Sequence, residues 1–119
     1  MICCIQASKI GTKIGEKHKS RKYNKAKIIY CPPYTLLNSF VNRLKKTRID
    51  VGAQNCHQSS SNGPFTGFIN SQMVKNLGCN YVILGHSESR NSGDTDLLIN
   101  EKIKSSLENN LNVLFCIGE

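Results

Sequence analysis

The chain contains no tryptophan, and only 7% of its 119 residues are aromatic. It has no Cys-x-x-C pair, since its six cysteines lie at positions 3, 4, 31, 56, 79 and 116. Small disulfide-rich secreted domains space their cysteines regularly. The scattered cysteines therefore indicate free thiols in a reducing compartment, and we expect a cytoplasmic protein.

Long apolar runs are also missing. No stretch approaches the length of about 20 residues that a membrane-spanning helix needs. Met1–Ala7 is too short for the core of a signal peptide and has no early positive charge beside it. We therefore expect no membrane partner and no secretory targeting.

Acidic residues are scarce at the amino terminus, and this accounts for most of the net charge of +8. Residues 1–27 hold eight Lys and Arg residues against Glu16 alone, so the other 92 residues carry a balance near neutrality. A basic protein can bind nucleic acid, but here the charge belongs to a leader, residues 1–26, and no aromatic residues are interleaved with it. We expect no nucleic-acid partner. The leader itself is open to three interpretations: a poorly ordered or weakly helical segment, which we favour, a targeting segment, or a nucleic-acid contact.

The remainder, residues 27–119, alternates short apolar runs with amphipathic segments. We predict strands at 28–31, 49–53, 81–84 and 113–116, with Thr35 and Ser71 as N-caps of the first two helices and a third helix over 94–110. Short buried strands alternating with helices indicate an α/β domain with a parallel sheet and right-handed crossovers. Residues 54–70 are polar and glycine-rich and form the longest predicted loop.

One stretch carries chemical information. The apolar run 81–84 is followed by Gly85 and then by the polar sequence His-Ser-Glu-Ser-Arg. Active sites of α/β proteins lie at the carboxyl ends of parallel strands. Taken without any family resemblance, His86 is better interpreted as a structural histidine at a strand end than as a site residue.

Four segments in register resemble the triosephosphate isomerase family: VGAQNC at 51–56, PFTGF at 64–68, GHSESR at 85–90 and VLFCIGE at 113–119. The resemblance implies a partial (β/α)8 TIM barrel, with strands that correspond to the second to fifth of eight. A complete barrel needs about 250 residues, so the chain is too short to close one.

The resemblance also implies a function. The family interconverts dihydroxyacetone phosphate and glyceraldehyde 3-phosphate in glycolysis and gluconeogenesis, without cofactor or metal, usually as a homodimer. His86 matches the electrophilic histidine, and Glu88 matches an acid that supports the site. Taken alone, Glu88 could be a solvated carboxylate at a helix start. Residues 54–70 match the loop through which members of the family dimerise, with Gln54 and Asn55 at its base and Thr66 and Gly67 at its tip.

Two positions depart from the family pattern. Phe68 stands where the family has a glutamate, and Ser89 stands where it has the first of two arginines. These two charged residues can form a salt bridge in the family. Losing both partners strands no charge, which suggests a compensated interface.

Other family features have no match. No Asn-x-Lys segment precedes residue 27, so the substrate-binding lysine is unknown. The glutamate base, the closing loop and the phosphate loops belong to the sixth to eighth strands of the family. We therefore expect these 119 residues to be inactive alone. The alternative is a non-catalytic half-barrel that acts as an interaction module.

Overall fold

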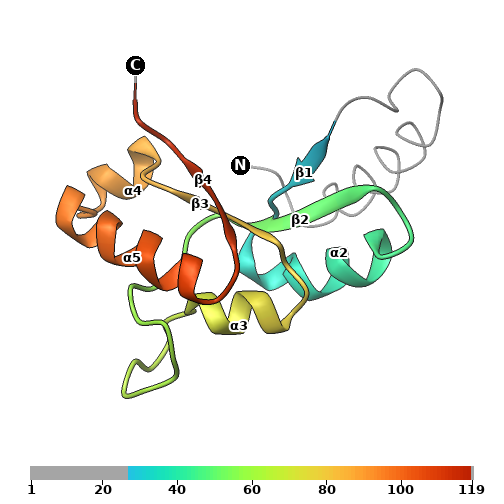
Figure 1. Ribbon diagram of the computed structural model, residues 1–119, viewed down its shortest axis with the longest axis horizontal. Coiled ribbons are helices and arrows are strands. Elements are labelled where there is room, and N and C mark those ends of the chain that lie inside the picture. Colours follow the sequence, from blue (N-terminus) through green and yellow to red (C-terminus); the bar gives the residue numbers. More distant parts are fainter. Residues whose placement is uncertain (1–26, 119) are drawn as a thin grey trace.

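The computed structural model describes residues 27–118, and the predicted leader lies outside these residues. Four strands and five helical segments follow one another in this part of the chain (Figure 1): β1 (Ile28–Tyr30), the 3-10 helix η2 (Tyr34–Leu36), α2 (Leu37–Leu44), β2 (Ile49–Ala53), α3 (Ser71–Asn76), β3 (Tyr81–Leu84), α4 (Ser87–Asn91), α5 (Asp96–Glu108) and β4 (Asn112–Phe115).

The strands form one parallel sheet in the order β1-β2-β3-β4, which confirms the predicted α/β architecture. Consecutive strands are therefore neighbours, and the crossovers between them contain α2, α3 and α5. These helices lie together on one side of the curled sheet (Figure 1). No helix in residues 27–118 is long and apolar enough to cross a membrane.

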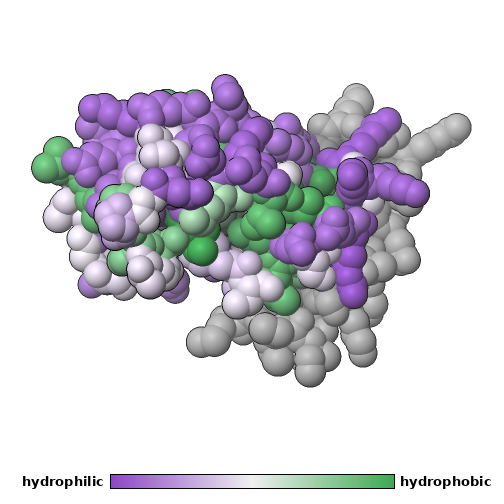
Figure 2. Space-filling model, turned by 90° about the horizontal axis from the view of Figure 1, so that it is seen from below, coloured by the Kyte–Doolittle hydropathy of each residue, from purple (hydrophilic) through white to green (hydrophobic). Residues whose placement is uncertain are grey.

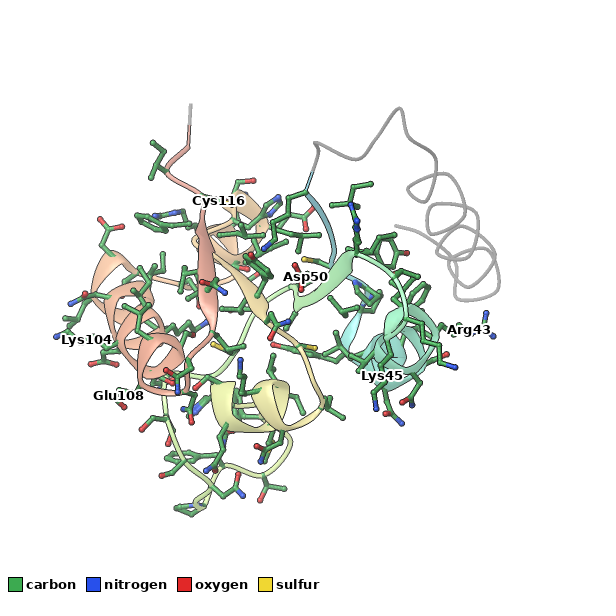
Figure 3. The ribbon with its side chains drawn as sticks, turned by 45° about the vertical axis from the view of Figure 1, so that its right-hand side comes forward. Arg43, Lys45, Asp50, Lys104, Glu108 and Cys116 are labelled. Atoms are coloured by element: carbon green, nitrogen blue, oxygen red, sulfur yellow. The ribbon has the colours of Figure 1, made fainter. Side chains whose placement is uncertain are left out.

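Alternate residues of each strand face the helices, because side chains along a strand point to opposite faces. Val51, Ala53, Val82 and Leu84 are buried in this way against a core that includes Phe40 of α2. Burying a side chain as large as Phe40 stabilises the fold by about 1.5–3 kcal/mol. The charged residues Arg43, Lys45, Lys104 and Glu108 are exposed on the helices and point away from the sheet (Figure 3).

Two predicted helix caps are wrong, although the helices exist. Thr35 lies inside η2, and α2 follows directly without a side-chain cap. The cap of α3 is Asn70 rather than Ser71, since the Asn70 side chain accepts a hydrogen bond from the Met73 amide at 2.8 Å. The predicted helix over 94–110 begins at Asp96 after Thr95, which caps it. A cap depends on backbone angles at one residue, which residue type alone does not determine.

The loop 54–70 is ordered by its own contacts. The ring of His57 contacts those of Phe65 and Phe68, with centroid distances of 4.6 and 4.8 Å. The His57 Nδ1 atom accepts a hydrogen bond from the Ser59 amide at 3.2 Å. The loop extends away from the sheet beside α3 (Figure 1). Seen from below, the surface is largely hydrophilic with a strip of apolar residues across it (Figure 2).

Candidate active site

The turn after β3 depends on Gly85. Its φ of +77° lies in the left-handed region, and a Cβ there would come within 2.8 Å of the Cys116 carbonyl oxygen and of the Phe115 ring. Only glycine combines this backbone conformation with so little space. The turn places His86 at the carboxyl end of the sheet, where the sequence predicted a site.

His86 is the N-cap of α4, which begins at Ser87. Its Nδ1 accepts a hydrogen bond from the Glu88 backbone N–H at 3.3 Å, while the Glu88 carboxylate lies 3.9 Å from the same nitrogen. A nitrogen that accepts a bond carries no proton, so the neutral ring has its proton on Nε2. The geometry therefore leaves Nε2 as a donor toward a ligand.

Arg90 closes the turn. Its Nε donates to the Gly85 carbonyl at 2.8 Å, and one terminal nitrogen donates to Asp96 at 2.6 Å. These two bonds tie the start of α5 to the end of β3 and hold α4 between them. The two bonds thus hold the backbone of the turn that carries His86.

His86 opens into a cavity of about 330 Å³. The cavity is lined by residues of η2, of the carboxyl ends of β2 and β3 and of α4: Tyr34, Gln54, Asn55, Ile83, His86, Glu88 and Ser89. The Glu88 side chain is 91% exposed, so it borders the cavity from the solvent side. The structure therefore brings His86 and Glu88 together with Gln54 and Asn55, which the resemblance had placed at the base of the dimer loop.

Asn55 is held from three directions. The Tyr34 hydroxyl donates to its backbone carbonyl, and its side-chain Oδ1 accepts bonds from the Cys56 amide at 2.9 Å and from Lys102 Nζ at 3.2 Å. Burial, and to a lesser extent the charges of Cys56 and Asp94, raises the pKa of Tyr34 far above its ordinary value, so its hydroxyl remains a donor.

Lys102 is itself paired with Asp94, at 2.7 and 2.9 Å from its two oxygens. Both side chains are nearly buried, with 7% and 12% exposed. This pair lies beside a second cavity of about 460 Å³, which His57, Gly67 and Phe68 also line. Both residues of the predicted loop tip, Thr66 and Gly67, are exposed, and Gly67 also borders this second cavity.

The two departures from the family pattern border neighbouring cavities. Ser89 lines the cavity of His86, and Phe68, 60% exposed, lines the second cavity and contacts His57. The structure thus has an aromatic contact where the family pattern has a glutamate. The idea of a compensated interface stays a prediction.

Several residues of this region were not found from the sequence. Tyr34 follows two prolines at a strand end, a position that could have indicated it, but Asp94 and Lys102 sit eight residues apart in a region interpreted only as an amphipathic helix. Within residues 27–118, no three His, Cys, Asp or Glu side chains come together as a metal-binding group.

Comparison with known proteins shows which family this chain resembles in sequence and fold. The family model described as triosephosphate isomerase matches residues 4–119, farther toward the amino terminus than the four motifs. The triosephosphate isomerase of Herpetosiphon aurantiacus is 50% identical over 93 residues, which cover 77% of this chain and 37% of that protein. That of Dictyoglomus thermophilum is 45% identical over 101 residues, covering 84% of this chain and 40% of that protein.

A solved structure agrees with the fold. The crystal structure of triosephosphate isomerase from Bartonella henselae superposes with a TM-score of 0.74 at 36% identity, covering 78% of this chain and 39% of that one. The four parallel strands are therefore part of a TIM barrel, as predicted. The chain spans about two fifths of the length of the relatives that it matches. Motifs, site geometry, sequence and fold agree, and the chain belongs to the triosephosphate isomerase family.

Proposed function

We propose that this chain is the segment of a triosephosphate isomerase that carries the electrophilic histidine. The complete barrel would interconvert dihydroxyacetone phosphate and glyceraldehyde 3-phosphate, a step of glycolysis and gluconeogenesis. The observation that carries the proposal is the hydrogen bond from the Glu88 amide to His86 Nδ1, because it makes Nδ1 the acceptor and leaves Nε2 as the ring nitrogen that can donate to a ligand.

The chemistry needs such a group. A carboxylate base moves a proton between two adjacent carbons, and negative charge develops on the oxygen of the substrate carbonyl. A positioned N–H donor stabilises that charge. A neutral imidazole can donate this hydrogen bond and still keep its proton. Triosephosphate isomerase is itself a standard example of a neutral histidine in this role.

Glu88 has a supporting role in this proposal. Its backbone N–H fixes the tautomer of His86, and its exposed carboxylate borders the same cavity. The carboxylate would pair with the substrate-binding lysine that the resemblance implies. Its exposure supports a contact with a group from another part of the barrel.

The 119 residues alone are proposed to be inactive. Glu88 is the one carboxylate that lines the His86 cavity in the described part of the chain, and the resemblance assigns the base to a later strand. General-base catalysis contributes about 10²–10⁴-fold, and the lost positioning of substrate adds to this.

The complete enzyme is proposed to be a cytoplasmic homodimer that uses no cofactor and binds neither nucleic acid nor membrane. The loop 54–70 supports the dimer, because it is ordered by internal contacts and exposes Thr66 at its tip. The second candidate function is a non-catalytic half-barrel interaction module. The unpaired side of β4 within the described residues favours it.

A chimaera tests the enzymatic proposal. Residues 27–118 replace the matching segment of the Herpetosiphon aurantiacus enzyme, which supplies the remaining strands. We expect isomerase activity that His86→Gln lowers about 10²–10³-fold, as for loss of one transition-state donor. His57→Gln is the matched control and should change activity less than about tenfold. An active chimaera that loses no more activity with His86→Gln than with His57→Gln would reject the proposal.

A further inference from the structure

Most of the buried side chains of α5 are polar. Ile99 is the apolar one, whereas Lys102, Ser105 and Ser106 are 6%, 3% and 0% exposed. A buried polar group costs free energy unless it is hydrogen-bonded. The partners of these side chains therefore show what this side of the helix is adapted to hold.

The partners lie largely in the loop 54–70. Three side chains of α5 and its C-cap hydrogen-bond to the first half of the loop: Lys102 Nζ to Asn55 Oδ1 at 3.2 Å, the Ser106 hydroxyl with the Cys56 thiol at 3.3 Å, and Asn109 Nδ2 to the Ser60 carbonyl at 2.8 Å. Residues spaced three and four apart share one face of a helix. One face of α5 thus runs along the loop and binds it at successive points.

The loop divides into a held half and an exposed half. None of residues 55–60 is exposed, whereas every residue from 61 to 68 is exposed, with Phe68 at 60%. Ser60 is the last residue of the held half, and its carbonyl is the group that Asn109 binds. The Asn109 bond therefore determines where the exposed half leaves the helix.

We propose that Asn109 is a positioning residue for subunit contact, because it holds Ser60 so that residues 61–68 are presented in one orientation to a second copy of the chain. The inference rests on the homodimer proposed above. The Asn109 amide is itself fixed by Ser71 Oγ at 2.9 Å and the Ser105 carbonyl at 3.1 Å. A loop that is ordered before binding loses less conformational entropy on association than a mobile one.

The test compares two substitutions in the chimaera described above. Asn109→Ala removes the bond to the loop, whereas Ser71→Ala removes a buried hydroxyl of the same network and leaves the bond to Ser60. Dilution followed by fluorescence-detected sedimentation velocity gives the dimer dissociation constant. It should rise about tenfold with Asn109→Ala, as for the loss of one ordering hydrogen bond, and less than about threefold with Ser71→Ala.

Hydrogen exchange of the assembled chimaera separates loosening of the loop from a general loss of stability. The His57 amide donates to the Ile69 carbonyl at 2.7 Å, and the Ser59 amide donates to His57 Nδ1 at 3.2 Å. Both amides belong to the held half. Asn109→Ala should speed their exchange at least about tenfold through local opening. Ser71→Ala should lower the midpoint of urea denaturation and leave their exchange nearly unchanged.

The outcomes distinguish this inference from the homodimer on which it rests. A dimeric chimaera in which Asn109→Ala and Ser71→Ala give the same dissociation constant, or the same exchange of the His57 and Ser59 amides, would overturn the role of Asn109 alone. A chimaera that remains monomeric without either substitution would overturn the homodimer and the inference together.

Discussion

The two ends of the sheet use polar residues differently. At the amino ends of the strands, Asp50 binds Lys27 at 3.2 Å and Asn80 at 3.0 Å, and the Lys27 side chain is 62% exposed. At the carboxyl ends, the Asp94–Lys102 pair is nearly buried and extends to Asn55, which lines both cavities. At the amino ends, polar side chains connect neighbouring strands on a solvent-exposed surface. At the carboxyl ends, they hold other side chains in place around the candidate site. TIM barrels generally divide stability and chemistry in this way.

The largest expected difference concerns the two ion pairs. Asp94→Asn leaves the ammonium group of Lys102 buried without a countercharge, which should cost about 3 kcal/mol or more of unfolding free energy. Asp50→Asn is the matched control at the other end, and its exposed partner should limit the loss to less than about 1 kcal/mol. Urea denaturation followed by circular dichroism measures both. Equal losses would mean that the two ends do not differ in the way described.

Gly85 tests the site end in a second way. Gly85→Ala forces a side chain into the left-handed region and against the Cys116 carbonyl, and should cost about 2–4 kcal/mol. Gly93→Ala is the control, because its φ is +117° with nothing within 4 Å of the added Cβ. It should therefore show the backbone cost alone. Thermal denaturation of both variants gives the comparison, and a smaller loss for Gly85→Ala would contradict the tight turn.

The two departures from the family pattern predict a smaller effect. Ser89→Arg alone introduces a charge without its glutamate partner, whereas Ser89→Arg with Phe68→Glu restores both. The single variant should be less stable, or dimerise less well in the chimaera, than the double variant, by about 1 kcal/mol. Denaturation and sedimentation equilibrium measure the two quantities. Equal effects of the single and double changes would refute a compensated interface.

The last expected effect is an alkaline loss of stability. Burial raises the pKa of Cys79 to about 11 from an ordinary value near 9. Between these values the unfolded thiol loses its proton while the folded one keeps it, so stability is present below pH 9 and falls as pH rises toward 11. Cys79→Ala should flatten the slope of unfolding free energy over this range. An unchanged slope would show that Cys79 does not titrate as described.

The sequence predicted the elements better than their details. The segments 49–53 and 81–84 each contain two β-branched apolar residues, and both strands occur where expected. His86 was considered because it follows Gly85 at the carboxyl end of a predicted strand, and the family resemblance assigned it to the site. Family resemblance then grouped it with Glu88, Gln54 and Asn55.

The long-range contacts of the site could not be predicted from the sequence. The bond from Tyr34 to Asn55 spans 21 residues, and that from Lys102 to Asn55 spans 47. No periodicity relates such positions, since they meet only when the strands align. The cap at Asn70 was missed for a local reason, because Asn and Ser are both good caps and stand side by side.

The tautomer of His86 tests the central claim most directly. A long-range ¹H–¹⁵N correlation spectrum of histidine-labelled protein at pH 7.5 identifies the protonated nitrogen, with His86→Gln assigning the signals. His57 is an internal comparison, because its Nδ1 also accepts a backbone N–H. The account predicts a neutral His86 with its proton on Nε2. A proton on Nδ1, or on both nitrogens, would contradict the role of His86 as a neutral electrophile.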